Sequence, residues 1–484
     1  MFSMVHIVCI LVCIILIQLS ICYKLVLKSS SEKLPTDQFQ NFQVKYHQKR
    51  SLSVIKSSSS EKQTPYRTLL QHPRVIKACE GFRAARSQKY KGNFNRLFSG
   101  YKLVQVHTFL SSGQTLPEQI PALRSPMITC KITSLLSDNP KVRLFEESVS
   151  LHQKLQKRPS SLKIFPPTSR KHVCFLGDLT PYGILQQIEH GEFLREVYSH
   201  RLKNTALEKL FTIQTIPEKL QYQNSLAFAV GFLTQKQFSR IHVGKSLPDF
   251  ASRSMNKHLN CPKLNMFSSQ VENAINSGQF IFKEAHPSTK RLVSLFNFTD
   301  IIKSSSLEIL QTTLSYLCNK ISPVCRKDKP CIRITSKGLT ETVRMTDNYF
   351  KNLIVNPLFT EISKLSTFPA FQGIMESIDN SKIFFHTYSS KLSFLLYLLR
   401  TLGLTITERP LSVSHFIFEV YANSEGSKFF RILFNGEDLT NQVLSCKNTA
   451  ASFSNLCPLS ILNNFITHGI FKQFKSQTYT EACQ

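Results

Sequence analysis

The stretch that decides the fold is Glu408–Leu439, which reads ERPLSVSHFIFEVYANSEGSKFFRILFNGEDL. Its two apolar runs, His415–Tyr421 and Phe429–Phe434, predict an antiparallel pair of strands, with Asn435-Gly436 as the turn beyond them. Far upstream, the β-branched run Lys102–Leu110 (KLVQVHTFL) leads into the turn-like SSGQTLP of Ser111–Pro117. That pattern predicts a buried strand feeding a loop.

Between these two regions the sequence alternates strand-like and helix-like patterns. Thr180 is placed as an N-cap and Pro181 in the first turn of a helix, after which apolar residues recur at helical spacing. The expected elements are a helix in Leu179–Leu202, a strand at Leu210–Thr215, a helix at Tyr222–Leu233, a largely helical region at Phe267–Cys331 broken by Pro323, a strand at Lys382–Thr387 and a helix at Leu392–Leu404 closing on Gly403. This order predicts an α/β fold with a mainly parallel sheet flanked by helices, and an inserted helical subdomain.

Composition restricts the class of protein further. The chain has 484 residues, of which 42% are hydrophobic, so wholesale disorder is excluded. Lys and Arg number 60 against 31 Asp and Glu, a formal net charge of +29, which favours polyanionic partners. Residues 24–97 are rich in basic residues and have weak apolar periodicity. They predict a partly disordered basic stem, with a polyanion-binding arm as the alternative.

The N-terminus carries a targeting signal. Val5–Cys22 is eighteen residues without a charge, long enough to enter a translocon and just span a bilayer. Residues 1–23 are therefore predicted to be a signal peptide or a signal anchor. Ser20 and Cys22 favour cleavage before Tyr23, whereas the lack of Lys or Arg before the apolar run weakens both interpretations. Either way the rest of the chain is expected to be lumenal or extracellular, which disfavours nucleic acid as a partner and favours a sulfated glycosaminoglycan or proteoglycan. An uncleaved segment would add membrane contact.

The cysteine count agrees with an oxidising compartment. Outside the N-terminal segment ten cysteines remain, an even number that fits a disulfide set. The spacing of Cys318, Cys325 and Cys331 contains no paired CxxC, so no zinc site is expected. Asn297-Phe298-Thr299 is a glycosylation sequon.

Several collinear segments resemble the histidine acid phosphatase family. They are Glu408–Leu439 with its S-H-x-x-F-E and R-x-x-x-N-G-x-x-L patterns, Val104–Pro117, Gly177–Tyr198, Leu456-Cys457-Pro458-Leu459 and Tyr479–Cys483. The resemblance covers roughly residues 98–484. It implies a histidine-phosphatase (phosphoglycerate-mutase-like) fold, with helical cap insertions at roughly 118–175 and 234–350.

The similarity is strongest to a Golgi type II membrane enzyme that dephosphorylates the xylose of the proteoglycan linkage region. It therefore implies a Golgi membrane location with a lumenal domain, secretion being the alternative. The resemblance also implies the disulfides Cys446–Cys457 and Cys261–Cys483. Cys130–Cys174 is a further candidate, because both residues flank one insertion.

The catalytic motifs of that family are replaced in this chain. The Arg-His-Gly-x-Arg-x-x-Pro motif, whose His attacks phosphorus and whose Args neutralise the phosphoryl oxygens, corresponds to Ser111, Ser112, Gly113, Thr115 and Pro117. A third family Arg corresponds to Leu220. The His-Asp pair that binds phosphate and protonates the leaving oxygen corresponds to Lys391 and Leu392. The resemblance thus implies a phosphoric monoester hydrolase fold whose nucleophile, arginines and proton donor are lost.

Two other residues are candidates to replace the catalytic groups of the family. Ser112 is a candidate hydroxyl nucleophile or a loop-capping serine, and Lys391 either holds an anion or is a solvated side chain. His107 and His386 are expected in the core, because their odd offsets point them away from Ser112 and Lys391. A shifted register would set His386-Thr387 in the place of His-Asp, still without an Asp.

Three functions follow: a pseudophosphatase that acts by binding, an active acid or sugar-phosphate phosphatase with a non-standard site, and a glycosaminoglycan-binding secreted protein. We favour the first. No metal or cofactor is expected, and the sequence does not specify an oligomeric state.

Overall fold

The computed structural model describes residues 69, 71–80, 100–116, 127–129, 139–155, 173–175, 177–202, 210–245, 261–276, 306–319, 335–380, 382–406, 409–447 and 455–484. The chain divides into two compact units, Met1–Lys62 and Gln63–Gln484, and every described residue belongs to the second. The N-terminal apolar segment, the sequon at Asn297 and Cys130 lie outside these residues. Within them, no helix combines the length and apolar character needed to cross a membrane.

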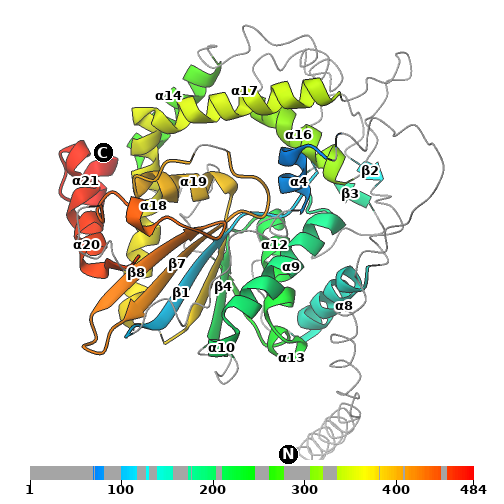
Figure 1. Cartoon of the computed structure of the whole chain (residues 1–484), viewed down its shortest axis with the longest axis horizontal. Coiled ribbons are helices and arrows are strands. Elements are labelled where there is room, and N and C mark those ends of the chain that lie inside the picture. Colours follow the sequence, from blue (N-terminus) through cyan, green and yellow to red (C-terminus); the bar gives the residue numbers. More distant parts are fainter. Residues whose placement is uncertain are drawn as a thin grey trace, which may run out of the picture. The chain divides into compact units, whose positions relative to one another are not determined.

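A central eight-stranded sheet organises the second unit (Figure 1). Its strands are β1 (Lys102–Leu110), β4 (Phe211–Thr215), β5 (Val243–Lys245), β6 (Phe385–Ser389), β7 (His415–Ala422), β8 (Lys428–Phe434), β9 (Glu437–Asp438) and β10 (Cys457–Pro458). The order is β10-β8-β7-β1-β6-β4-β5, with β9 paired to β8. The pairs β1–β6, β6–β4 and β4–β5 are parallel, whereas β7 joins β1 antiparallel and β8 joins β7 in the same way. A separate pair, β2 (Met127–Thr129) and β3 (Val173–Phe175), lies off this sheet.

Helices lie on both faces of the sheet and beyond the ends of its strands. They are α4 (Pro73–Glu80), α8 (Pro140–Leu155), α9 (Pro181–Val197), α10 (Ser199–Leu202), α12 (Lys219–Phe232), α13 (Gln235–Phe238), α14 (Pro262–Asn276), α16 (Ser306–Cys318), α17 (Ser336–Val355), α18 (Pro357–Asn380), α19 (Leu392–Thr401), α20 (Leu459–Asn464) and α21 (Tyr479–Cys483). The predicted α/β fold with a helix-flanked sheet is therefore confirmed. The sheet is parallel through β1, β6, β4 and β5, as expected, whereas β7, β8, β9 and β10 make the other half antiparallel, because they are joined by hairpins and short returns. Figure 1 shows α16 and α17, which come from the region predicted as a cap insertion, beyond the ends of the strands.

The alternation of apolar side chains along β7 builds two cores. Ile417 and Tyr421 face α9 and α12, whereas Phe416 and Phe418 face α18 and α19. Such burial of apolar surface on both sides of the sheet is the main source of stability for a fold of this kind.

Glycines allow α9 and α12 to lie in close contact. A Cβ added to Gly231 would lie 1.9 Å from the backbone oxygen of Ile188, and one added to Gly191 would lie 2.2 Å from that of Phe228. The two helix backbones therefore touch at positions where no larger residue fits.

Several predicted elements are confirmed. Strand β1 has the predicted bounds, and Thr180 caps α9 by accepting a hydrogen bond from the Gly183 amide at 3.0 Å. Strand β6 begins and ends later than predicted. It lies between β1 and β4, and its bounds are set by its pairing with both. The disulfides Cys446–Cys457 and Cys261–Cys483 are both present. The proposed Cys130–Cys174 pair cannot be placed, since Cys130 is outside the described residues.

One part of the predicted stem is folded. Helix α4 lies inside residues 24–97, yet Val75 and Ala78 are fully buried and Cys79 forms a disulfide with Cys318 of α16. At least residues 73–80 therefore pack as part of the second unit.

Candidate functional site

Three chain segments that correspond to family motifs meet at one edge of the sheet. Strands β1, β6 and β4 run parallel, with Leu110 in register with Ser389 and Ser389 in register with Thr215. The segments that follow these strands therefore emerge side by side, as expected at the carboxyl ends of a parallel sheet. They are Ser111–Leu116, Ser390-Lys391 and the start of α12.

The loop after β1 is held by uncharged side chains. Asn224 of α12 accepts a hydrogen bond from the Gly113 amide at 3.1 Å and donates to the Ser389 hydroxyl at 3.0 Å. The Ser389 hydroxyl donates in turn to Gln221 Oε1 at 2.9 Å. Gln187 of α9 donates to the carbonyl oxygen of Ser111 at 2.8 Å.

These four side chains, Gln187, Gln221, Asn224 and Ser389, are all buried, and we refer to them as the polar network. The sequence patterns did not single them out. The sequence offered one signal for them: amide and hydroxyl side chains in segments that are otherwise apolar, because buried polar groups need hydrogen-bond partners.

Ser112 lies half-buried at the centre of this loop, and its carbonyl oxygen accepts from the Val413 amide at 2.9 Å. Within the described residues, no hydrogen bond joins its hydroxyl to a histidine or a carboxylate. A serine needs a neighbouring base to become a nucleophile. Among the described residues, Ser112 therefore has no histidine or carboxylate hydrogen-bonded to its hydroxyl as an activating base.

Gly113 is required by close packing. A Cβ at this position would lie 2.3 Å from the backbone oxygen of Gly183 at the start of α9. Thr115 forms an isolated bridge with Leu179, and its carbonyl oxygen accepts from the Ser315 hydroxyl of α16 at 2.6 Å. Both residues thus shape the loop and anchor it to its neighbours.

The lysines at this edge have carboxylate partners. Lys391, at the N-cap of α19, lies 2.9 Å from Glu218, and Lys219 lies 2.5 Å from Asp178. The sequence left Lys391 as either an anion ligand or a solvated side chain. In the structure its ammonium is paired with the Glu218 carboxylate. An anion at this position would have to compete with Glu218.

Leu220 and Leu392 belong to the apolar packing. Leu220 lies against the core of α9 and α12, and Leu392 lies against the core of α18 and α19. The structure therefore brings Ser111, Ser112, Gly113 and Lys391 to one edge and leaves these two leucines outside the polar network.

Helix α4 is fixed on top of the loop. Gln114 Nε2 donates to the carbonyl oxygen of Ala78 at 3.0 Å, and Gln186 Nε2 donates to that of Cys79 at 2.7 Å. At the other end of the helix, Arg74 forms an ion pair with Asp347 of α17 at 2.6 Å. Together with the Cys79–Cys318 disulfide, these contacts attach α4 to the loop, to α9 and to α16 and α17.

The buried histidines lie on the core side, as predicted for His107 and His386. Their rings stack with centroids 4.6 Å apart, and Gln105 bonds both of them, at 3.1 Å to His107 and 3.0 Å to His386. Burial lowers the pKa of His386 to about 4 and that of His107 well below its ordinary range. Neutral imidazoles without access to the loop are structural groups here.

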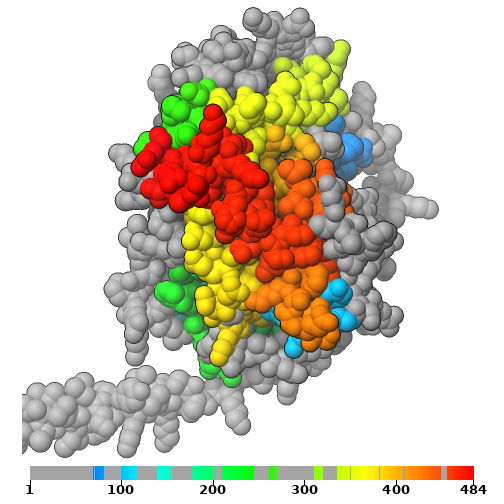
Figure 2. Space-filling view, turned by 90° about the vertical axis from the view of Figure 1, so that its left-hand side faces the viewer, coloured from blue at the N-terminus to red at the C-terminus, as the bar shows by residue number. Residues whose placement is uncertain are grey.

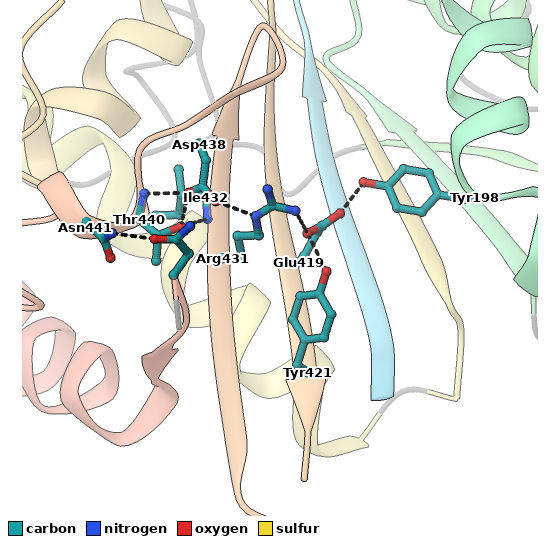
Figure 3. Close-up of polar contacts among 9 residues, drawn as sticks. Tyr198, Glu419, Tyr421, Arg431, Ile432, Asp438, Thr440 and Asn441 are labelled. Carbon is teal, nitrogen blue, oxygen red and sulfur yellow. Dashed lines mark hydrogen bonds and ion pairs between the residues drawn. The ribbon is translucent and has the colours of Figure 1, made fainter. Parts of the chain in front are cut away.

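The family-like motifs around β7 and β8 form a buried ionic contact (Figure 3). Glu419 is fully buried and accepts hydrogen bonds from Tyr198 at 2.7 Å and Tyr421 at 2.8 Å. Arg431, directly opposite in the ladder, lies 3.6 Å from Glu419 and donates to Asp438 at 2.6 Å. Burial raises the pKa of Glu419, while Arg431 and the two tyrosines act against that rise. These motif residues hold the hairpin together.

Comparison with known proteins shows a similarity to phosphatases. No family model matches it. It is 22% identical to 2-phosphoxylose phosphatase 1 of Xenopus tropicalis over 400 residues, covering 79% of this chain and 77% of that protein. The human protein of the same name is 23% identical over 407 residues, covering 79% and 81%.

The chain is similar in sequence to the 2-phosphoxylose phosphatases. The resemblance indicated by the motifs is thereby confirmed. Among solved structures, the Hafnia alvei phytase in complex with tartrate matches with a TM-score of 0.48 and 14% identity, covering 80% of this chain and 99% of the phytase. The phytase from D. castellii matches with a TM-score of 0.46 and 16% identity, covering 82% and 85%.

Within the described residues, no group of three His, Cys, Asp or Glu side chains could hold a metal ion.

Proposed function

We propose that this chain is a phosphatase-like protein of the secretory pathway that has lost phosphate-ester hydrolysis and acts by binding. Its relatives are named for the removal of phosphate from phosphoxylose. The N-terminal apolar segment supports this location, and a Golgi membrane protein with a lumenal domain is the form we favour.

The polar network carries this proposal. Phosphoryl transfer needs a nucleophile and positive charge on the phosphoryl oxygens, and each lost oxyanion donor typically costs on the order of 100–1000-fold in rate. At this edge of the sheet, Asn224 and Gln187 bond the loop backbone with neutral amides. These hydrogen bonds hold the loop backbone through uncharged side chains, which is the opposite of the cationic lining that a phosphoryl group requires.

The ion pairs support the same conclusion. Lys391 and Lys219 are matched by Glu218 and Asp178, so neither offers an uncompensated charge to a phosphate group. A bound dianion would displace a carboxylate from a partly buried lysine, at an electrostatic cost that a working phosphatase avoids.

Phosphate release tests the proposal. The full chain in detergent is incubated at pH 4–7 with 2-phosphoxylose and with p-nitrophenyl phosphate, alongside human 2-phosphoxylose phosphatase 1 as the positive control. We expect no phosphate release above that of a reaction without protein, from the parent chain or from its Ser112→Ala variant. The matched control is Ser393→Ala, which changes an exposed serine of α19.

Turnover abolished by Ser112→Ala and unaffected by Ser393→Ala would make the chain an active phosphatase with a serine nucleophile. Turnover that survives both substitutions would equally end the pseudophosphatase proposal, because another nucleophile would then be at work.

A further inference from the structure

Basic side chains from three distant parts of the chain gather at the turn Lys472–Phe474. Lys364 of α18 donates to Gln473 Oε1 at 2.6 Å, and the Lys263 ammonium of α14 lies 5.5 Å from the centre of the Phe474 ring. Lys472 and Lys475 are exposed on the turn itself. With Arg400 of α19, these residues form what we call the basic cluster.

The basic cluster is not neutralised internally. Within the described part of the chain, none of Lys263, Lys364, Arg400, Lys472 and Lys475 forms an ion pair with a carboxylate. Lys364 and Arg400 instead donate to neutral oxygens, those of Gln473 and Thr360. This differs from the sheet edge, where Lys219 and Lys391 both have acidic partners.

Positive charges oppose one another within the basic cluster. Burial lowers the pKa of Lys364 first, and the nearby charge of Arg400 lowers it further, while Glu361 acts in the opposite direction. Further along the C-terminal segment, Glu481 accepts a hydrogen bond from the Gln477 amide. An external anion would relieve this repulsion.

The turn that carries the lysines is firmly seated. Phe471 packs on Phe368 with ring centres 4.8 Å apart, and Tyr479 stacks on the same ring at 5.0 Å. The Cys261–Cys483 disulfide joins the start of α14 to the end of α21. Figure 2 shows the C-terminal segment at the surface beside α14 and α18. The basic cluster is thus presented on a rigid, solvent-facing surface, which lowers the entropic cost of binding.

We propose that the basic cluster is a docking surface for a sulfated polysaccharide. Several cations spread over a surface turn and the neighbouring helices match a linear polymer that carries many sulfates. Counterions released from such a polymer would supply most of the binding free energy, as in other polyelectrolyte complexes. This inference extends the proposed binding role and does not depend on the loss of catalysis.

Heparin affinity of the full chain in detergent tests the docking surface. The double variant Lys472→Gln, Lys475→Gln removes two exposed charges. The control, Lys236→Gln with Arg240→Gln, removes two exposed charges near α13. We expect the slope of log Kd against log salt to fall by about 2 for the first variant and by clearly less for the control.

Each remaining outcome refutes the assignment. An equal effect of both double variants would mean that heparin senses only net charge. An unchanged slope for the Lys472 and Lys475 variant would place heparin binding elsewhere. If that variant instead loses binding to phosphatidylserine vesicles and keeps its heparin affinity, the surface faces an anionic membrane. Thermal unfolding midpoints of both variants are measured alongside and should match the parent chain. Phosphate release is scored separately, so failure here leaves the proposed function standing.

Discussion

Acidification from pH 7 to pH 5 should weaken the fold, because four histidines are buried in two pairs on opposite faces of the sheet. His107 stacks on His386, and His190 lies against His415, with ring centres 4.6 Å apart in both pairs. Burial lowers the pKa of all four, and brings those of His386 and His415 to about 4. Each of these residues must therefore stay neutral in the folded protein at mildly acidic pH.

The sign and the size of the effect follow from proton linkage. The unfolded chain takes up protons on these histidines below about pH 6.5, whereas folded His386 and His415 do so only near pH 4. Their contribution to stability is complete above pH 6.5 and is lost as the pH falls towards 4. At pH 5, about 1.5 units below the unfolded pKa, the loss is about 2 kcal/mol for each, or about 4 kcal/mol for the two.

Urea unfolding at pH 7 and pH 5 measures this loss, with His386→Gln as the variant. Glutamine does not titrate, so the difference in unfolding free energy between the two pH values should shrink by about 2 kcal/mol. Glu419 works in the opposite sense, because burial raises its pKa, but it does so equally in both proteins. Equal stability of the parent chain at the two pH values, or an unchanged difference in the variant, would refute the reasoning.

Three further substitutions probe contacts that hold the fold. Cys79→Ser removes a crosslink between residues 239 positions apart, so it should lower the unfolding free energy by up to about 5 kcal/mol. A thermal midpoint equal to that of the parent chain would show that α4 needs no disulfide. Arg431→Met leaves the buried Glu419 carboxylate without its cation and should lower the unfolding free energy in urea by about 3–5 kcal/mol. Adding Glu419→Gln should recover much of this loss. No recovery would show that Asp438 is the more important partner of Arg431. Gly231→Ala should destabilise by roughly 1–3 kcal/mol in the same assay, whereas Gly244→Ala, with nothing closer than 3.7 Å, should not; similar losses would contradict the close α9–α12 packing.

Local patterns were enough to predict much of the architecture. The nine residues of β1, the N-cap at Thr180 and the hairpin of β7 and β8 depend on side-chain alternation, capping and turn chemistry within short stretches. The disulfides Cys446–Cys457 and Cys261–Cys483 came from the family resemblance, which transfers contacts that no local pattern contains.

Other elements depended on long-range packing. No local pattern predicted α18, which continues through Pro369 because the helix is buried along much of its length against the sheet. The basic composition around α4 suggested a solvated stem, yet a disulfide and hydrogen bonds to Gln114 and Gln186 hold this helix on the domain. Composition describes average solvation, and it cannot register such specific contacts.

The candidate site shows the same division. The sequence by itself predicts that the catalytic residue types of the similar family are replaced at Ser111, Ser112 and Lys391, because motif positions can be read along the chain. Only the tertiary structure decided what stands in their place: the neutral bonds of Asn224 and the pairing of Lys391 with Glu218. It likewise assembled the basic cluster from residues more than 200 positions apart. Charges and hydrogen bonds act over a few ångströms in space, and folding alone brings those partners within reach.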